Sequence, residues 1–191
     1  MEDKRALTQW NKSDISYQNY IGYIEEKPNK FELSIVDLFY IKNFKGGSAT
    51  INEPKGIVKT KLVRYSNLLK QIGEKFSGKK LNELNDSEEN ELIELAKEGL
   101  DLVTPKNESK IDGFSTSFLT TLFHFYFPNL FPILDRRVLN GLNMISESDL
   151  DSQKQVKNIQ SFYPKLIKEF RLQTVDKSIR ELDKELFTVK I

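Results

Sequence analysis

Hydrophobic residues recur at helical spacing along most of the chain. In segment 58–76 they stand three or four positions apart, as on one face of an amphipathic helix: Leu62, Tyr65, Leu69, Ile72 and Phe76. The same spacing predicts helices over 86–103, 116–127, 136–142, 149–160 and 164–187, the last interrupted near residue 174. A weaker pattern predicts a helix over 15–25. An apolar stretch over 33–44 predicts a buried helix, with a strand as the alternative.

Residues that start and stop helices support these boundaries. The run from Asp86 to Glu89 predicts a capping box, and Asp135 predicts the N-cap of the helix after it. Glycines follow segments 33–44 and 58–76, and Pro128 ends segment 116–127. No series of alternating strands appears. We therefore expect an all-α fold, with residues 1–191 forming a single compact domain of about eight helices.

Composition excludes several classes of function. The chain has no Cys and one His, which excludes disulfides, thiolate zinc sites, iron–sulfur clusters and His-rich metal sites. We expect neither a metal nor a cofactor. The 29 basic and 28 acidic residues give a net charge of +1, so a nucleic-acid site would have to be a local patch.

The sequence shows no targeting or membrane segment. The first residues are polar and lack an apolar signal core, and no stretch reaches the roughly 18 apolar residues of a membrane span. Abundant Lys, Asn and Ile suggest an AT-rich bacterial genome. We expect a cytoplasmic bacterial protein without a membrane partner, associated with the nucleoid if it binds DNA.

Segment 111–135 carries the most information. A glycine turn at Gly113 precedes an apolar helix, and the segment ends in Phe-Pro-Ile-Leu-Asp at Asp135. This arrangement resembles the helix-hairpin-helix DNA glycosylases. Gly113 matches the first hairpin glycine, Ser117 takes the position of the family's Lys, and Asp135 follows it by eighteen residues without a gap. The Asp135 phrase is most similar to adenine glycosylases that act opposite oxidised guanine, which also have Ser at that position.

The segment departs from the family pattern in identifiable ways. Ser115 replaces the second hairpin glycine, and Asp112 stands where the family has Pro. The absence of Cys excludes the iron–sulfur cluster of many relatives. The resemblance covers about 30 residues, with residues 111–142 holding the hairpin and the Asp region. In size and degeneracy the chain is also similar to oxoguanine-glycosylase-like accessory proteins of bacterial anti-phage operons.

The resemblance implies a catalytic role for Asp135. A carboxylate stabilises the positive charge that develops on the sugar as a base departs, or it activates water. A plain N-cap is the alternative. Adenine glycosylases also use a Glu on an early helix to protonate the base. Asp37 stands near that position and is the candidate second carboxylate, with a polar helix-face residue as the alternative.

The remaining candidates concern DNA. The turn before Ser117 would offer backbone N–H groups to a phosphate, for which an ordinary turn is the alternative. The expected DNA-binding residues are Lys110, Gly113, Ser115, Ser117, Arg136 and Arg137, with solvated charges as the alternative for the basic ones. Ser117 has no amine for a Schiff base, so an active enzyme would be monofunctional.

Other chemistry-bearing residues have structural interpretations. Apolar side chains of 118–127 are expected in the core, with His124 as a core or rim residue. Trp10 is expected to pack, with base stacking as the alternative. Lys45, before two glycines, could approach a phosphate, for which a helix C-cap is the alternative. The charges of 165–190 predict a solvated helical face.

Three functional hypotheses follow. The first is a monofunctional DNA glycosylase that hydrolyses N-glycosidic bonds in duplex DNA without lyase activity. The second is a catalytically inactive binding or regulatory protein of the same fold, for example in anti-phage defence. The third is an unrelated helical interaction protein. The sequence does not specify protein partners, the substrate base or a choice between DNA and RNA.

Overall fold

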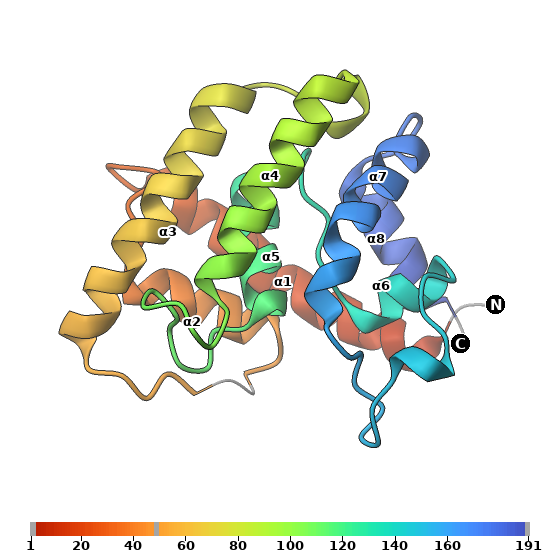
Figure 1. Ribbon diagram of the computed structural model, residues 1–191, viewed down its shortest axis with the longest axis horizontal. Helices are drawn as coiled ribbons and strands as arrows, with labels where there is room; N and C mark the ends of the chain where they lie inside the picture. The colour runs from red at the N-terminus through yellow and green to blue at the C-terminus, as the bar shows by residue number, and fades with distance from the viewer. Residues whose placement is uncertain (1–2, 48–49, 190–191) are drawn as a thin grey trace.

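Helices form every regular element of the chain in the computed structural model, which describes residues 3–47 and 50–189 (Figure 1). Within those residues there is no β-strand, and Leu150 and Val156 form an isolated antiparallel bridge. The all-α prediction is confirmed. The α-helices are α1 (Lys4–Glu26), α2 (Ile35–Phe44), α3 (Lys55–Phe76), α4 (Asp86–Leu102), α5 (Thr116–Tyr126), α6 (Arg136–Gly141), α7 (Tyr163–Gln173) and α8 (Ile179–Thr188). Short 3-10 helices are η1 (Leu81–Glu83), η2 (Glu147–Asp149) and η3 (Ile159–Phe162).

Helix α5 is the centre of the fold. All its residues from 119 to 126 are buried, including Phe123 and Phe125, so the predicted core role of this segment is confirmed. At its two apolar ends, Phe118 and Phe127 are partly buried against the same core. Because a helix that is buried on all sides must be covered on all sides, α1, α2 and α4 pack against α5.

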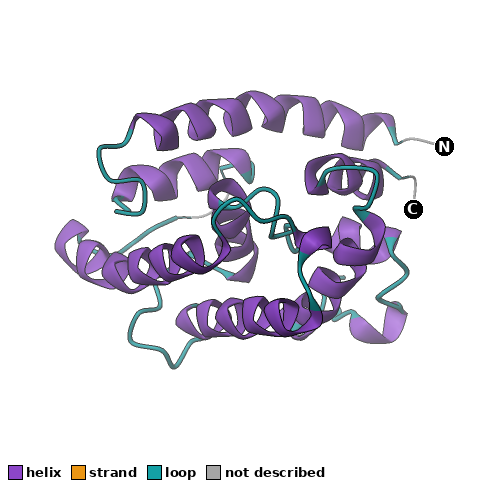
Figure 2. Ribbon diagram, turned by 90° about the horizontal axis from the view of Figure 1, so that it is seen from above, coloured by secondary structure: helices purple, strands orange, loops and turns teal. Residues whose placement is uncertain are grey.

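The covering helices form two groups joined by the longest helix. In Figure 1, α2, α3 and α4 lie around α5, and α6, α7 and α8 lie to their right. Helix α1 contacts α2 and α5 in one group and α8 in the other, and Figure 2 shows it running along the molecule. The Asp3 N–H donates to the Thr188 carbonyl at 2.7 Å, which ties the two ends of the described chain together. The two groups contact each other through α4 and α7, and also where Lys45 at the end of α2 reaches Asp135 at the start of α6.

Several predicted boundaries need correction. Helix α1 begins at Lys4 and not near residue 15. Its first half buries only Ala6 and Trp10, so the sequence shows little apolar periodicity there. The capping box of α4 is formed by Asn85 and Glu88, one residue before the predicted pair. The predicted break near residue 174 is confirmed by the gap between α7 and α8.

The helix predicted over 149–160 is wrong. Only the short η2 and η3 touch this segment, and a loop lies between them. The Asp151 carboxylate accepts the N–H groups of Gln153 and Gln155, both at 2.8 Å, so it offers the backbone a local alternative to helical hydrogen bonds. Lys154 and Asn158 have φ of 58° and 48°, which a right-handed helix does not contain.

Candidate functional site

Side chains of α5 fix the backbone that leads to Asp135. Thr120 Oγ1 accepts the N–H of Leu134 at 3.1 Å, and His124 Nδ1 lies 2.8 Å from the carbonyl oxygen of Phe131. These partners are buried, so the segment is held from within the core. Asp135 therefore stands on a fixed support although it follows a non-helical stretch.

The Asp135 carboxylate has two partners. One oxygen accepts the Arg137 N–H at 2.8 Å, which makes Asp135 the N-cap of α6 as predicted. The other lies 3.2 Å from Lys45 Nζ, at the C-cap of α2. The exposed fractions of the two side chains are 24% for Asp135 and 18% for Lys45. The carboxylate is thus partly shielded from water and remains reachable from outside.

Asp135 and Lys45 line a small cavity of about 60 Å³ together with Asp183 of α8. We call it the Asp135 pocket. Its aromatic walls are Trp10, Phe44 and Phe187. Apolar walls lower the local dielectric and strengthen electrostatic interactions among the three charged groups.

Asp183 is the buried member of this group. Burial raises the pKa of its carboxyl to about 7, and the nearby charge of Asp135 acts in the same direction. Arg180 and Lys45 act against that rise, and Arg180 Nη1 lies 3.7 Å from the Asp183 carboxylate. The Asp183 carboxyl group therefore titrates near neutral pH, and it lies in the same pocket as the Asp135 carboxylate.

The Arg180 side chain lies behind this pocket, between aromatic rings. Its guanidinium carbon is 3.8 Å from the ring centroid of Trp10 and 4.4 Å from that of Tyr17, and Nη2 lies 3.2 Å from Asp14. Aromatic faces attract a guanidinium. Trp10 thus packs, as expected, and it also holds the cation that faces Asp183.

Asp37 lies in a different environment. Its carboxylate is fully buried and accepts hydrogen bonds from Tyr20 at 2.9 Å, Lys27 at 3.0 Å and Tyr126 at 3.1 Å, and from the Ser34 backbone at 2.7 Å. It does not line the Asp135 pocket. Asp37 is in the first turn of α2, so about 12 Å of helix separates it from the C-cap of that helix. Asp37 thus links α2 to the end of α1 and to α5 through buried hydrogen bonds.

The predicted turn before α5 is present. Gly113 has φ of 79°, and a Cβ placed there would lie 2.1 Å from the carbonyl oxygen of Thr50. The Asp112 N–H donates to the Glu53 carboxylate at 2.6 Å, and Lys110 Nζ donates to the carbonyl of Phe114. The Glu53 carboxylate therefore accepts the hydrogen bond of the Asp112 amide, one of the backbone amides that the resemblance assigns to a DNA phosphate.

Lysines surround that carboxylate. Lys61 Nζ lies 2.5 Å from Glu53 and 2.5 Å from the Lys110 carbonyl. Burial acts to raise the pKa of Glu53, but the hydrogen bonds from Lys61 and the Asp112 amide outweigh it, and the pKa lies below its usual value. Burial lowers the pKa of Lys110. The turn is thus closed by an internal ion pair.

Two serines complete the predicted hairpin region. Ser115 is the exposed N-cap of α5 and makes no side-chain capping bond. The carbonyl of Ser117 accepts the hydroxyl of Thr121 at 2.8 Å and that of Thr120 at 3.2 Å. The Thr120 hydroxyl also accepts the N–H of Leu134, the residue before Asp135. One hydroxyl therefore links the backbone of Ser117 to the backbone that leads to Asp135.

Arg136 and Arg137 line a neighbouring open pocket of about 550 Å³, which Lys154 also lines. Arg136 donates to the Lys154 carbonyl, and Arg137 Nη1 lies 3.2 Å from Asp3. The structure thus places both arginines immediately beside Asp135. Of the predicted hairpin residues, Ser117 lies in the first turn of α5, and Lys110, Gly113 and Ser115 precede that helix.

Asp183 and Arg180 were missed by sequence reasoning, which assigned the C-terminal charges to a solvated face. Asp183 is 3% exposed. A signal was present: residues 179, 182, 183 and 186 have the spacing of one inner helix face, and Asp183 is the polar member among Ile179, Leu182 and Leu186. A carboxylate on an apolar face is a candidate for an unusual environment.

Comparisons with known proteins leave the site to be judged on its geometry, since no family model, no curated protein and no solved structure matches the chain. No cluster of His, Asp and Glu in the described part of the chain has the arrangement of a metal site. No helix of residues 3–47 and 50–189 has both the length and the apolar character for crossing a bilayer.

Proposed function

We propose that this protein hydrolyses N-glycosidic bonds in duplex DNA and releases a base without cutting the strand. The observation that carries the proposal is the Asp135 pocket, where two carboxyl groups in unlike environments share one cavity with Lys45. One of them, Asp135, stands where the sequence resemblance assigns the catalytic carboxylate. Unlike environments divide two carboxyl groups into a proton donor and an anion.

The proposed reaction assigns one role to each carboxyl group. As the bond between the sugar C1′ and the base nitrogen breaks, its electron pair goes to the base, and Asp183 donates the proton that the base takes up. The Asp135 carboxylate stabilises the positive charge on the sugar. Water then adds to C1′ and gives its proton to Asp135. Lys45 positions the Asp135 carboxylate.

The absence of strand cutting is also part of the proposal. Ser117 has no amine, and Lys45 Nζ is engaged with the Asp135 carboxylate at 3.2 Å. An ammonium in an ion pair is a hydrogen-bond donor, whereas a Schiff base requires a free amine. The arginines beside Asp135, Arg136 and Arg137, supply positive charge for a neighbouring phosphate.

The test is base release from a panel of duplexes carrying oxidised guanine, adenine opposite oxidised guanine, alkylated bases or uracil. We expect one member to be cleaved after hot alkali and not before it, with no covalent adduct on borohydride reduction. The Asp183→Asn variant should lose this cleavage, whereas Asp176→Asn, at an exposed loop position, should keep it. Equal cleavage by all three proteins contradicts the role of Asp183.

A second candidate is a binding module of the same fold without catalysis. Two observations favour it. The Asp135 pocket, at about 60 Å³, is smaller than the roughly 300–1,000 Å³ of ligand sites, so a base would enter only after Trp10 and Phe187 move. The Asp112 amide also donates its hydrogen bond to Glu53, so it is not free for a DNA phosphate. This alternative predicts duplex binding that weakens with salt, and no base release from any substrate.

A further inference from the structure

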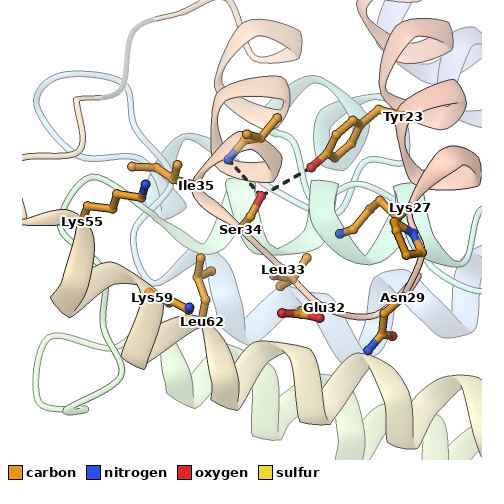
Figure 3. A pocket seen from close by; sticks show the side chains of 12 residues that line it. Tyr23, Lys27, Asn29, Glu32, Leu33, Ser34, Ile35, Lys55, Lys59 and Leu62 are labelled. Atoms are coloured by element: carbon orange, nitrogen blue, oxygen red, sulfur yellow. Dashed lines mark hydrogen bonds between the residues drawn. The ribbon is translucent and has the colours of Figure 1, made fainter.

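A second cavity lies between the N-terminal ends of α2 and α3 and the end of α1. Its volume is about 450 Å³, within the range of small-molecule sites, and it shares no lining residue with the Asp135 pocket. Figure 3 shows it from close by. We call it the α2–α3 cavity.

A buried lysine forms one wall of this cavity. The Lys27 side chain is 8% exposed, and its ammonium donates to Asp37 at 3.0 Å and to the Tyr126 hydroxyl at 2.9 Å. An ammonium has three N–H donors, and these are its two hydrogen bonds to the described residues. Neither partner lines the cavity, so the ammonium is directed into the packing of α1, α2 and α5. Lys27 therefore forms a fixed wall of the cavity, and its charge is compensated by Asp37.

Two further lysines stand across the cavity from Lys27. Lys55 and Lys59 are one turn apart at the start of α3, and Figure 3 shows them on the opposite side. Neither makes an ion pair with the residues that the structure describes. Asp37 compensates the charge of Lys27, so the uncompensated charges of the lining are Lys55 and Lys59 against the one carboxylate of Glu32, an excess of positive charge that attracts anions.

Between the cations the lining is apolar and aromatic. Leu33 and Leu62 are buried residues that line the cavity, and the Tyr23 ring lines it on the far side of Ser34 and Lys27. The Tyr23 hydroxyl lies 3.4 Å from Ser34 Oγ, which holds the ring in place (Figure 3). Apolar surface with a few convergent polar groups is the usual composition of a small-molecule site.

We propose that the α2–α3 cavity binds a nucleoside monophosphate, with its phosphate between Lys55 and Lys59 and its base against Leu33 and Leu62. The lysines match the charge of the phosphate, and the apolar lining matches a planar base. The volume admits a molecule of this size. This binding is separate from the proposed glycosidic reaction, since the two cavities share no residue.

The test is calorimetric titration of the protein with AMP, GMP, CMP and UMP, and with inorganic phosphate and adenosine as partial ligands. We expect at least one nucleotide to bind about tenfold more tightly than either partial ligand. The double variant Lys55→Gln/Lys59→Gln should weaken that binding by at least about tenfold. Lys70→Gln is the matched control, because Lys70 is an exposed residue of the same helix outside the cavity.

The outcomes separate this proposal from the glycosidic one. No binding of any of the four nucleotides overturns it, as does equal affinity of the wild type and the double variant. Phosphate binding as tight as nucleotide binding also overturns it, because the base would then contribute nothing. Asp135→Asn should leave nucleotide affinity unchanged, and the double variant should retain the fold by circular dichroism because both lysines are exposed.

Discussion

The Lys45 ammonium lies 3.2 Å from the Asp135 carboxylate, although 90 positions separate the two residues in the chain. One residue is the C-cap of α2 and the other is the N-cap of α6. Asp183 of α8 lines the same pocket. The candidate site therefore arises where the two groups of helices meet, and it requires both groups to be folded and in register.

Replacing Lys45 by Gln should move the pH dependence of base release. The positive charge of Lys45 acts to lower the pKa of Asp183, so its loss raises that pKa and extends activity to higher pH. The free energy of unfolding should fall by less than about 1 kcal/mol, because the ion pair is partly exposed. The pH profile and urea denaturation measure the two effects. Lys184→Gln, an exposed change on α8, should leave the profile in place.

Replacing Asp37 by Asn should destabilise the fold by about 3–5 kcal/mol. The substitution leaves the buried Lys27 ammonium without its counter-charge, and breaking a buried pair has a cost of this size. Urea denaturation measures the loss. The double variant Lys27→Met/Asp37→Asn should be less destabilised than the sum of the two single variants. Strict additivity would contradict the coupling of these residues.

Two buried groups should give opposing pH dependences of stability. Burial lowers the pKa of His124 from 6.5 to about 4, so the unfolded chain binds more protons between these values, and stability is lost as pH falls. Burial raises the pKa of Asp183 from 3.8 to about 7, so the folded chain binds more protons there, and stability is lost as pH rises. The effect amounts to about 3 kcal/mol for His124 and about 4 kcal/mol for Asp183 across their windows.

Single variants should separate these effects. Relative to the wild type, His124→Gln should gain stability as pH falls from about 6.5 to 4, and Asp183→Asn should lose it. The measurement is urea denaturation across this range, with all three proteins compared at each pH so that the exposed carboxylates cancel. Parallel curves for the three proteins would show that neither group is perturbed by burial.

Gly113 should be intolerant of a side chain for two reasons, and Gly46 provides the control. Both have positive φ, of 79° and 83°, but a Cβ at Gly113 meets the Thr50 carbonyl, whereas one at Gly46 meets open space. Gly46→Ala should cost about 1 kcal/mol from the backbone alone. Gly113→Ala should cost at least about 2 kcal/mol, since an overpacking term is added. Thermal or urea denaturation measures the loss of stability in each variant. Equal losses would contradict the close approach of the Thr50 carbonyl to Gly113.

The fold was predictable where apolar residues mark a continuous helix face, as in segments 58–76, 86–103 and 116–127. It was not predictable over 149–160, where the Asp151 side chain replaces helical hydrogen bonds with local ones. The start of α1 was also hidden, because only Ala6 and Trp10 are buried in its first half. Helices with few buried residues leave little pattern to detect.

The candidate site was predictable in part. Asp135 was found because a local motif marks it, and its N-cap role follows from its position. Its partners Lys45 and Asp183 come from distant helices, and which residues meet across the two groups depends on tertiary packing. Asp37 was selected for its position near that of the resembled enzymes' Glu, and the structure surrounds it with four hydrogen-bond donors from neighbouring residues in a buried environment.

The most direct test of the proposed function is the single-turnover rate of base release by Asp135→Asn on the duplex that the wild type cleaves. Asn caps a helix as well as Asp does, so the fold and its stability should be kept. We predict a fall in rate of about a thousandfold, because the variant lacks the negative charge that stabilises the sugar. A folded Asp135→Asn protein that releases the base at the wild-type rate would contradict the role of Asp135.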